Sequence, residues 1–220
     1  MSKNKNGIMG SNSGKIGTVV AYKWKGKDVF RAYSRSKNNP RTPAQQLHRA
    51  KFKSVNLLAS DLLPLLKCGF RSAAERLSST ETGLFVKTNW PLVEADAEGG
   101  IGIPLDRVLV SKGDLPCVEF GEPQVSGSGR RMVVSVDFDT VDRTSVTNDD
   151  YVYLGAYCPA AKVSLLSAPV KRLEGRVQMN IPPIMLGETI HLYGFAEGSD
   201  YNPQHRYEAS DSRYLGTIAG

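Results

Sequence analysis

The sequence predicts an α+β protein in which a basic N-terminal β-hairpin and several helices precede an antiparallel immunoglobulin-like β-sandwich. Three observations predict this order. Two runs of β-branched and aromatic residues flank Gly26, apolar residues recur at helical spacing after Thr42, and short β-like runs follow one another from Leu105 onward. These patterns divide the chain into a flexible basic arm (1–16), a hairpin plus helical domain (17–94), a linker (95–104) and a β-sandwich domain (105–220).

The basic residues are concentrated toward the N-terminus. The 220 residues include 28 Lys and Arg against 22 Asp and Glu, a formal net charge of +6. Residues 1–53 contain 13 of the basic residues and one acid, Asp28, so their net charge is +12, whereas residues 54–220 contain 15 basic and 21 acidic residues, a net charge of −6. This asymmetry favours a polyanionic partner, nucleic acid first. An acidic protein surface, including that of a neighbouring copy, is the alternative.

Composition also excludes several classes of protein. No run approaches the ~18 apolar residues of a membrane span, and the first residues lack the apolar segment of a signal peptide. We therefore expect the protein to act in the cytoplasm, or to leave the cell by lysis or by a dedicated machine. The widely spaced Cys68, Cys117 and Cys158 argue against a disulfide framework and a zinc site. A catalytic pair of Cys158 and His191 would require a coincidence of the fold.

The N-terminal hairpin is predicted by two strand-like runs on either side of a charged, glycine-containing turn. The strands are expected at about Gly17–Trp24 and Val29–Ser34, with Gly26 in the turn. Side chains alternate between the two faces of a strand, and basic and aromatic residues interleave along both runs.

The first helix has a strong start signal in Thr42-Pro43-Ala44-Gln45. Thr42 can cap the helix, Pro43 suits the first helical position, and Gln45 can complete a capping box. Because Pro64 interrupts the pattern, we expect a break near Ser60-Asp61, with Asp61 capping the second piece.

Two shorter segments follow before the linker. Gly69 is expected to stop the second helical piece, and Ser72-Ala73-Ala74-Glu75 reads as a capping box that opens another helix. Residues 80–90 fit either a helical turn or an extended segment.

About seven to eight strands are expected in the roughly 115 residues from Leu105 onward, a size typical of immunoglobulin-like sandwiches. The Cys…Trp…Cys signature of true immunoglobulin domains is absent. The similar runs at 153–157, 192–196 and 214–218 are interpreted as core strands, since their unequal spacing does not fit a repeat.

The candidate binding surface is the basic hairpin together with the start of the first helix. Lys and Arg neutralise phosphates and release counterions. The aromatic residues Tyr22, Trp24, Phe30 and Tyr33 could stack on the bases of a single strand, or the ribbon could lie in a duplex groove. The candidate nucleic-acid-binding residues are Lys15, Lys23, Trp24, Lys25, Lys27, Arg31, Tyr33, Arg35, Lys37, Arg41, Arg49, Lys51 and Lys53.

Motifs for catalysis and cofactors are weak. The segment GSNSGKIGT does not fit a P-loop, because no GK[ST] follows a buried strand. The pairs Asp137/Asp139 and Asp149/Asp150 lack the pattern of a strong calcium loop and fit solvated turns better. We expect no cofactor and no metal, and no Ser/His/Asp arrangement is evident.

A resemblance covers nearly the whole chain. The runs YKWKGKDVFRAYSRSKNNPRTPAQQLHRAKF (22–52), LLPLLKCGF (62–70), VKTNW (86–90) and LVSKGDLP (109–116) resemble an uncharacterised protein family common in Bacteroidota and their phages and mobile elements. Its features are a WKG hairpin, an NPRTPAQQ helix start and a C-terminal β-domain. The NPRTPAQQ segment (39–46) also resembles a motif of phage-encoded minor virion proteins. The resemblance implies no catalytic residues and a structural role in a phage or mobile element.

We therefore expect a non-enzymatic structural or accessory protein of a phage-like particle, which forms homo-oligomers. Its basic part would contact nucleic acid, DNA in preference to RNA, or neighbouring particle subunits. The first alternative is a cellular nucleic-acid-binding protein whose β-sandwich binds a partner. The second is an enzyme with a site in the sandwich near Asp137 or Asp139.

Overall fold

The computed structural model describes residues 13–34, 41–95, 100–128, 131–140, 147–202 and 204–219. Contacts between residues divide the chain into two compact units, residues 1–46 and residues 47–220. The division lies inside the first helix, a few residues before the point where the charge of the sequence changes sign. The first unit contains one small sheet, and the second contains most of the helical residues and the remaining sheets.

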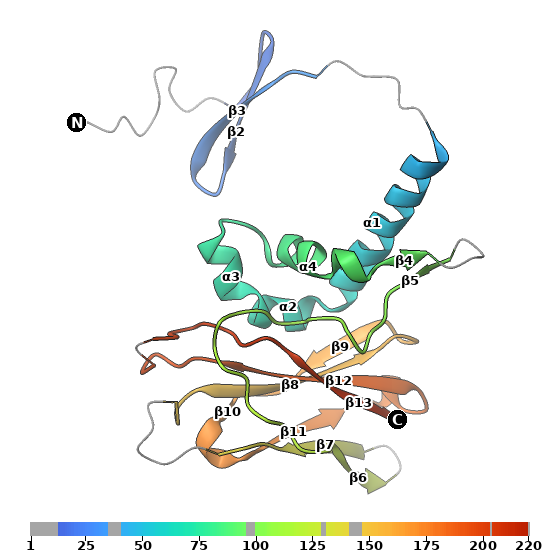
Figure 1. Cartoon of the computed structure of the whole chain (residues 1–220), viewed down its shortest axis with the longest axis vertical. Coiled ribbons are helices and arrows are strands. Elements are labelled where there is room, and N and C mark those ends of the chain that lie inside the picture. Colours follow the sequence, from blue (N-terminus) through green and yellow to red (C-terminus); the bar gives the residue numbers. More distant parts are fainter. Residues whose placement is uncertain are drawn as a thin grey trace. The chain divides into compact units, whose positions relative to one another are not determined.

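The N-terminal unit holds a three-stranded antiparallel sheet, whereas the sequence predicts a two-stranded hairpin. Figure 1 labels the two longer strands of this sheet, β2 and β3. Its strands, in spatial order, are β1 (Gly14–Ile16), β2 (Val19–Trp24) and β3 (Lys27–Ala32). β1 lies in the segment that was expected to be a flexible arm, and residues 1–12 of that arm lie outside the described residues. Because β1 is only three residues long and includes a glycine and a lysine, its sequence carries almost no strand signal.

The turn between β2 and β3 confirms the predicted hairpin. Lys25 and Gly26 have φ angles of 46° and 75°, and the flanking residues Trp24 and Lys27 pair directly. Two central residues with positive φ form the type I′ turn, whose twist matches that of the strands it joins. Glycine adopts this φ without a steric penalty, which explains its place in the turn.

The start of α1 (Pro43–Asp61) is confirmed. The Gln45 backbone N–H donates a hydrogen bond to the Thr42 hydroxyl oxygen at 3.4 Å, the contact of an N-cap. The predicted break is also confirmed, because α1 ends at Asp61 and α2 (Leu63–Gly69) carries Pro64 in its first turn. α2 ends at Gly69, the residue that was predicted to stop it.

Two predicted caps are wrong. No side chain caps α2, and the Asp61 carboxylate instead accepts a hydrogen bond from the Tyr157 hydroxyl at 3.2 Å. The next helix, α3 (Arg71–Arg76), begins after Phe70 and also has no side-chain cap. The Ser72 hydroxyl oxygen instead accepts a hydrogen bond from the backbone N–H of Ala209 at 3.4 Å. At each junction the backbone N–H of the residue between the two helices donates to a carbonyl oxygen of the preceding helix, Leu62 to Leu58 and Phe70 to Leu66.

Residues 80–90, left open by the sequence, are helical. They form α4 (Glu81–Asn89), followed by the 3-10 turn η1 (Trp90–Leu92). Thr80 caps the helix, since its hydroxyl accepts a hydrogen bond from the Gly83 N–H at 3.1 Å. In the described part of the chain, every helix is too short or too polar to cross a membrane.

Two further antiparallel sheets and a two-stranded pair follow the helices. The pair, β4 (Glu94–Ala95) with β5 (Ile101–Gly102), brackets most of the predicted linker. The other elements are β6 (Gln124–Ser128), β7 (Arg131–Asp137), β8 (Tyr151–Cys158), β9 (Val163–Leu166), β10 (Val170–Lys171), η2 (Arg172–Glu174), β11 (Arg176–Ile181), η3 (Pro183–Met185), β12 (Thr189–Glu197) and β13 (Arg213–Ala219).

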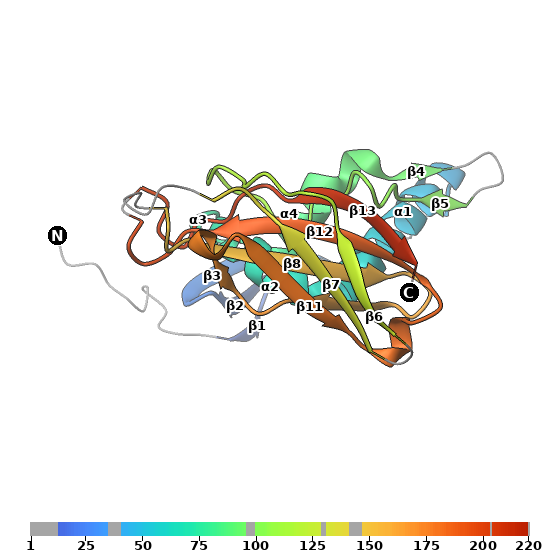
Figure 2. The ribbon, with the colours of Figure 1, turned by 90° about the horizontal axis from the view of Figure 1, so that it is seen from below.

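The two larger sheets share a hydrophobic core. One sheet has the order β10-β8-β12-β13, with β9 also paired to β8, and the other has the order β11-β7-β6. Figure 2 shows β6, β7 and β11 lying over β8 and β12. Val134 and Val177 from one sheet and Leu154 and Leu192 from the other belong to a single cluster of buried residues. The mixed α+β class with antiparallel sheets is therefore confirmed.

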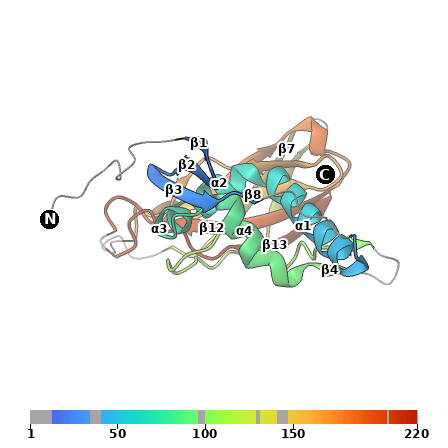
Figure 3. The ribbon, with the colours of Figure 1, turned by 90° about the horizontal axis from the view of Figure 1, so that it is seen from above.

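Helices cover the opposite face of the β8–β12 sheet (Figure 3). Tyr153 and Phe195 from this face form a second cluster with Leu65, Phe70 and Phe85 from the helices. β8 and β12 are buried along almost their whole length, because a layer packs on each side of them. The helices and the strands on either side of segment 95–104 thus belong to the same compact unit.

Glycines in two of the similar runs, 153–157 and 192–196, permit this close packing. A Cβ atom at Gly155 would lie 2.5 Å from Leu65 Cδ2 of α2, and one at Gly194 would lie 2.5 Å from the Phe120 ring. Such contacts are too short for any residue larger than glycine. Each glycine is therefore required by a different contact, Gly155 of β8 by α2 and Gly194 of β12 by Phe120.

Candidate nucleic-acid interface

The strand register places most aromatic and basic residues of the N-terminal sheet on one face. Residues directly opposite each other in an antiparallel pair point to the same face. Trp24 of β2 lies opposite Lys27 of β3, and Lys15 of β1 lies opposite Val20 of β2. With the alternate positions along each strand, this face, here called the aromatic–basic face, comprises Lys15, Val20, Tyr22, Trp24, Lys27, Val29, Arg31 and Tyr33.

The three rings of the aromatic–basic face are open to solvent. Tyr22, Trp24 and Tyr33 keep 39%, 44% and 46% of their surface exposed. A half-exposed ring on a strand presents a flat π-surface while its other contacts hold it in place. Such rings are the platforms on which nucleic-acid bases stack.

Lysine side chains approach two of these rings. The Lys15 ammonium lies 3.8 Å from the centroid of the Tyr33 ring, and the Lys25 ammonium, in the turn, lies 5.6 Å from the Trp24 ring. Both distances are within the range of a cation–π interaction. Positive charge therefore lies directly beside the surfaces that could receive a base, where a phosphate of the same nucleotide would be neutralised.

The opposite face of the sheet is largely apolar, and it carries Lys23. This predicted site residue lies across from Asp28, on the side away from the rings. Phe30, a predicted stacking residue, also lies on this face, 50% exposed, whereas Ala21 is only 2% exposed. Alternation within one strand is readable from the sequence, but the pairing that combines two strands into one face is not. The apolar residues of this face are Ile16, Val19, Ala21, Phe30 and Ala32.

Four of the predicted residues lie at the first helix. Arg41 precedes α1, and Arg49 and Lys53 lie one turn apart on exposed positions of it. Lys51 has a structural partner, because its ammonium donates a hydrogen bond to the Val93 carbonyl oxygen at 3.1 Å. These residues therefore belong to α1 and the segment just before it, and not to the strands that form the aromatic–basic face. Outside the described residues lie two further members of the predicted set, Arg35 and Lys37.

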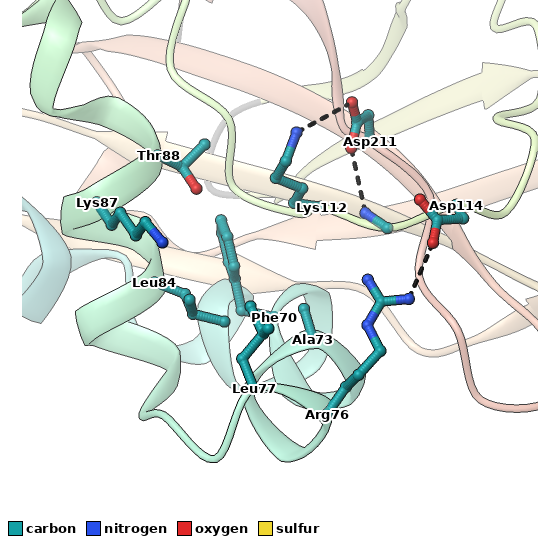
Figure 4. A pocket seen from close by; sticks show the side chains of 11 residues that line it. Phe70, Ala73, Arg76, Leu77, Leu84, Lys87, Thr88, Lys112, Asp114 and Asp211 are labelled. Carbon is teal, nitrogen blue, oxygen red and sulfur yellow. Dashed lines mark hydrogen bonds and ion pairs between the residues drawn. The ribbon is translucent and has the colours of Figure 1, made fainter.

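A second candidate location is a hollow of about 450 Å³ bounded by α3, α4 and residues 112–114 (Figure 4). Its floor is apolar and includes Phe70 and Leu84. Lys87 points into it without an acidic partner among the described residues. The other cations at the rim are already neutralised in two ion pairs, Arg76–Asp114 at 2.9 Å and Lys112–Asp211 at 3.7 Å. The hollow therefore offers a polyanion much less charge than the N-terminal sheet does.

The sheet geometry separates Cys158 from His191. Tyr157 lies opposite His191, so its neighbour Cys158 points to the other face, into the core between the two sheets. The Nδ1 atom of His191 lies 2.9 Å from the Tyr214 hydroxyl oxygen instead. These two side chains cannot form a catalytic pair.

The aspartates that the sequence presents as pairs have separate partners. Asp137 and Asp139 form ion pairs with different arginines. Asp149 forms an ion pair with Lys171, whereas Asp150 is buried and accepts hydrogen bonds from the loop after β12. Across the described ranges, no group of three or more His, Cys, Asp or Glu is arranged to hold a metal ion. These carboxylates serve as ion-pair and hydrogen-bond partners.

A buried carboxylate links the helices to the sheet. Glu197 of β12 is 4% exposed, forms an ion pair with Arg71 of α3 and accepts a hydrogen bond from the Tyr153 hydroxyl at 3.0 Å. The Cys68 thiol donates to the same carboxylate at 3.7 Å. Burial, and then the negative charge of Glu197, raise the pKa of Cys68 to about 12. The thiol is therefore protonated at neutral pH and is a poor nucleophile.

Comparison with known proteins places the chain in a family. The model of DUF6266, a family of unknown function, matches residues 11–216. The chain belongs to the DUF6266 family. The match spans the N-terminal sheet, the helices and all but the last residues of β13, so it includes residues of both units. No curated protein matches the chain, and the expected links to Bacteroidota and phages stay predictions.

Proposed function

We propose that this DUF6266 protein is a non-enzymatic structural or accessory protein of a phage-like particle, and that its N-terminal sheet contacts nucleic acid. The aromatic–basic face carries the proposal. It places three exposed rings beside Lys15, Lys27 and Arg31 on a single side of a small sheet. Lys and Arg bind phosphates, and aromatic rings stack on bases, so that the two kinds of side chain together match both parts of a nucleotide.

The charge distribution supports a polyanionic partner. Residues 1–53 carry a net charge of +12 around this sheet and the start of α1. Each phosphate neutralised by Lys or Arg releases a counterion, which gives an affinity that depends strongly on salt. The remaining 167 residues carry a net charge of −6, which repels nucleic acid and favours contact through the N-terminal part.

The second unit would supply contacts between protein subunits. Its two antiparallel sheets share a core, which supports an immunoglobulin-like sandwich as the finer description of this unit. Exposed apolar side chains such as Leu173 and Ile184 leave room for contacts with other subunits. In the proposed arrangement the protein forms homo-oligomers through contacts of this unit.

Binding of fluorescent oligonucleotides over a series of salt concentrations tests the nucleic-acid contact. If about six phosphates are neutralised, the logarithm of the binding constant should fall with a slope near −5 against the logarithm of salt on duplex DNA, and near −4 on a single strand. The double variant Lys27→Gln/Arg31→Gln should reduce the slope by about 1.5 to 2. Equal, salt-insensitive binding by both proteins would refute the contact.

A matched control removes the same charge from the second unit. Lys67 of α2 and Arg107 are exposed there, and the variant Lys67→Gln/Arg107→Gln should retain the wild-type slope. If both double variants lose the same affinity, net charge and not the aromatic–basic face determines binding.

A cellular nucleic-acid-binding protein with a partner-binding β-domain is the second candidate function. The aromatic–basic face favours it equally, because that face does not depend on a particle. Mass spectrometry of purified phage-like particles from a host that encodes this chain separates the two. The chain in stoichiometric amounts supports the particle role, and its absence from particles favours the cellular one.

A further inference from the structure

We infer that the N-terminal sheet binds single-stranded nucleic acid in preference to duplex, with bases stacked on Tyr22, Trp24 and Tyr33. This inference rests on the proposed nucleic-acid contact and specifies the class of partner that the same face accepts. It follows from the placement of the rings, the spacing between them and the position of the cations.

The π-surfaces of bases are available only in an unpaired strand. In a duplex each base is stacked between its neighbours, so that a protein reaches base edges in the grooves and not base faces. The aromatic–basic face offers three half-exposed rings, which suit base faces. Its cations, Lys15, Lys27 and Arg31, suit phosphates and also the edges of guanine. The rings are therefore the feature that favours a strand with unpaired bases.

The spacing of the rings requires bases that can separate. Tyr22 and Trp24 are two residues apart on β2 and share a face, which places their Cα atoms about 7 Å apart. Stacked bases in a duplex are about 3.4 Å apart along each strand. Successive bases can reach both rings only if their mutual stacking is broken, which a flexible single strand permits at low cost.

The cations are arranged so that phosphates can lie between the stacked bases. Lys27 lies directly across from Trp24, and Lys27 and Arg31 are the two diagonal neighbours of Tyr22 on β3. At the other end of the face, the Lys15 ammonium lies 3.8 Å from the centroid of the Tyr33 ring, and Tyr33 keeps 46% of its surface exposed. Three rings accommodate about three nucleotides per sheet.

The test compares one 20-nucleotide DNA strand of mixed sequence with the duplex that it forms with its complement. Both carry the same label and are titrated by fluorescence anisotropy with the full chain at one salt concentration. We expect tighter binding of the single strand. In a Trp90→Phe background Trp24 is the only remaining tryptophan, and the single strand, but not the duplex, should quench its fluorescence.

Variants separate stacking from charge. Trp24→Leu and Tyr22→Leu keep an apolar side chain and all cations, and each should weaken single-strand binding roughly 5- to 150-fold while duplex binding changes little. Tyr22→Phe retains the ring and should bind as the wild type does. Phe30→Leu, on the opposite face, is the matched control and should also have no effect. A circular-dichroism spectrum and melting curve of each variant check that the sheet remains folded.

The outcomes distinguish the inference from the proposed function. Duplex binding equal to or tighter than single-strand binding, with no effect of Trp24→Leu, overturns the inference and leaves the proposed function intact. Failure of the wild type to bind either probe at low salt overturns both. Tighter single-strand binding that is lost in the leucine variants and kept in Tyr22→Phe supports the inference.

Discussion

The Lys15 ammonium lies over the ring of Tyr33, 3.8 Å from its centroid, and so joins the first strand of the N-terminal sheet to the residue that follows the third. β1 is three residues long and pairs with β2, and β3 pairs with β2 on its other side, so this contact bridges the two edges of the described sheet. A cation–π contact at an exposed site contributes about 0.5–1 kcal/mol. The same lysine thus stabilises the sheet and supplies a charge for a phosphate.

The first prediction concerns this lysine. Lys15→Met should weaken oligonucleotide binding and reduce the salt slope on a single strand by about 0.7, because one phosphate contact is lost. Lys23→Met removes the same charge from the opposite face and should change the slope less. Anisotropy titrations between low and physiological salt measure both slopes. Equal losses in the two variants would contradict the assignment of the aromatic–basic face.

The second prediction concerns the ion pair between Arg71 and Glu197. Arg71→Met leaves the buried Glu197 carboxylate without its cation and should lower the free energy of unfolding by about 1–3 kcal/mol. The matched control is Arg176→Met, which removes the partner of Asp137 in a pair that is about half exposed on both sides and should cost under about 1 kcal/mol. Urea unfolding followed by circular dichroism compares them. A larger loss of stability in the control would show that burial does not determine how much these ion pairs contribute to the free energy of unfolding.

The sequence predicted those features that depend on neighbouring residues. The turn at Lys25-Gly26, the Thr42 cap and the break before Pro64 are local, because their signals lie within four residues of the structure they specify. The wrong caps at Asp61 and Ser72 are local signals whose side chains instead bond to residues distant in the sequence.

The candidate site was predictable only in part. Composition indicated that cations and aromatic residues gather near the N-terminus, and most of the residues chosen from the sheet do lie on one face. The inclusion of Lys23 and Phe30 could not be corrected from the sequence, because register depends on which residues pair across strands. β1, which contributes Lys15 to the face, was missed for lack of any strand signal in Gly14–Ile16. The partners of Glu197 were also hidden, since they converge from three separate elements.

The third prediction concerns the contact between Gly155 and Leu65. Gly155→Ala places a methyl group where Leu65 Cδ2 would be 2.5 Å away, and the resulting overpacking should cost about 1–3 kcal/mol of stability. Gly102→Ala, at a strand position with no atom within 4 Å of the new methyl group, is the control and should change stability little.

A double-mutant cycle tests the cause. Leu65→Ala alone should cost about 2–5 kcal/mol, because it opens a cavity in the core. If the two side chains collide, Leu65→Ala/Gly155→Ala should cost less than the sum of the single changes, since the added methyl group fills part of that cavity. Strict additivity would mean that Gly155 is not required for the approach of α2 to β8.

The fourth prediction is a loss of stability in alkaline solution. Burial raises the pKa of the Cys68 thiol to about 12 from an ordinary value of 9.0, and the negative charge of Glu197 adds to the effect. The folded protein therefore retains this proton at pH values where the unfolded chain releases it. The contribution of Cys68 is fully present below about pH 9 and is lost as the pH rises toward 12, by about 1 kcal/mol per pH unit. Burial also raises the pKa of the Tyr153 and Tyr193 hydroxyls, which adds a loss in the same direction above about pH 10.

Urea unfolding at pH 8, 9, 10 and 11 measures this loss in the wild type and in Cys68→Ser. The serine hydroxyl is somewhat smaller than the thiol and can also donate to Glu197, but it does not titrate in this range. The wild-type unfolding free energy should begin to fall above pH 9. That of Cys68→Ser should fall less steeply, because burial also raises the pKa of the Cys117 thiol, which both proteins retain. The difference between the two curves isolates the thiol, because every tyrosine is present in both proteins. Parallel curves between pH 9 and pH 10 would show that Cys68 titrates at its ordinary pKa, and that its thiol is neither buried nor held against Glu197.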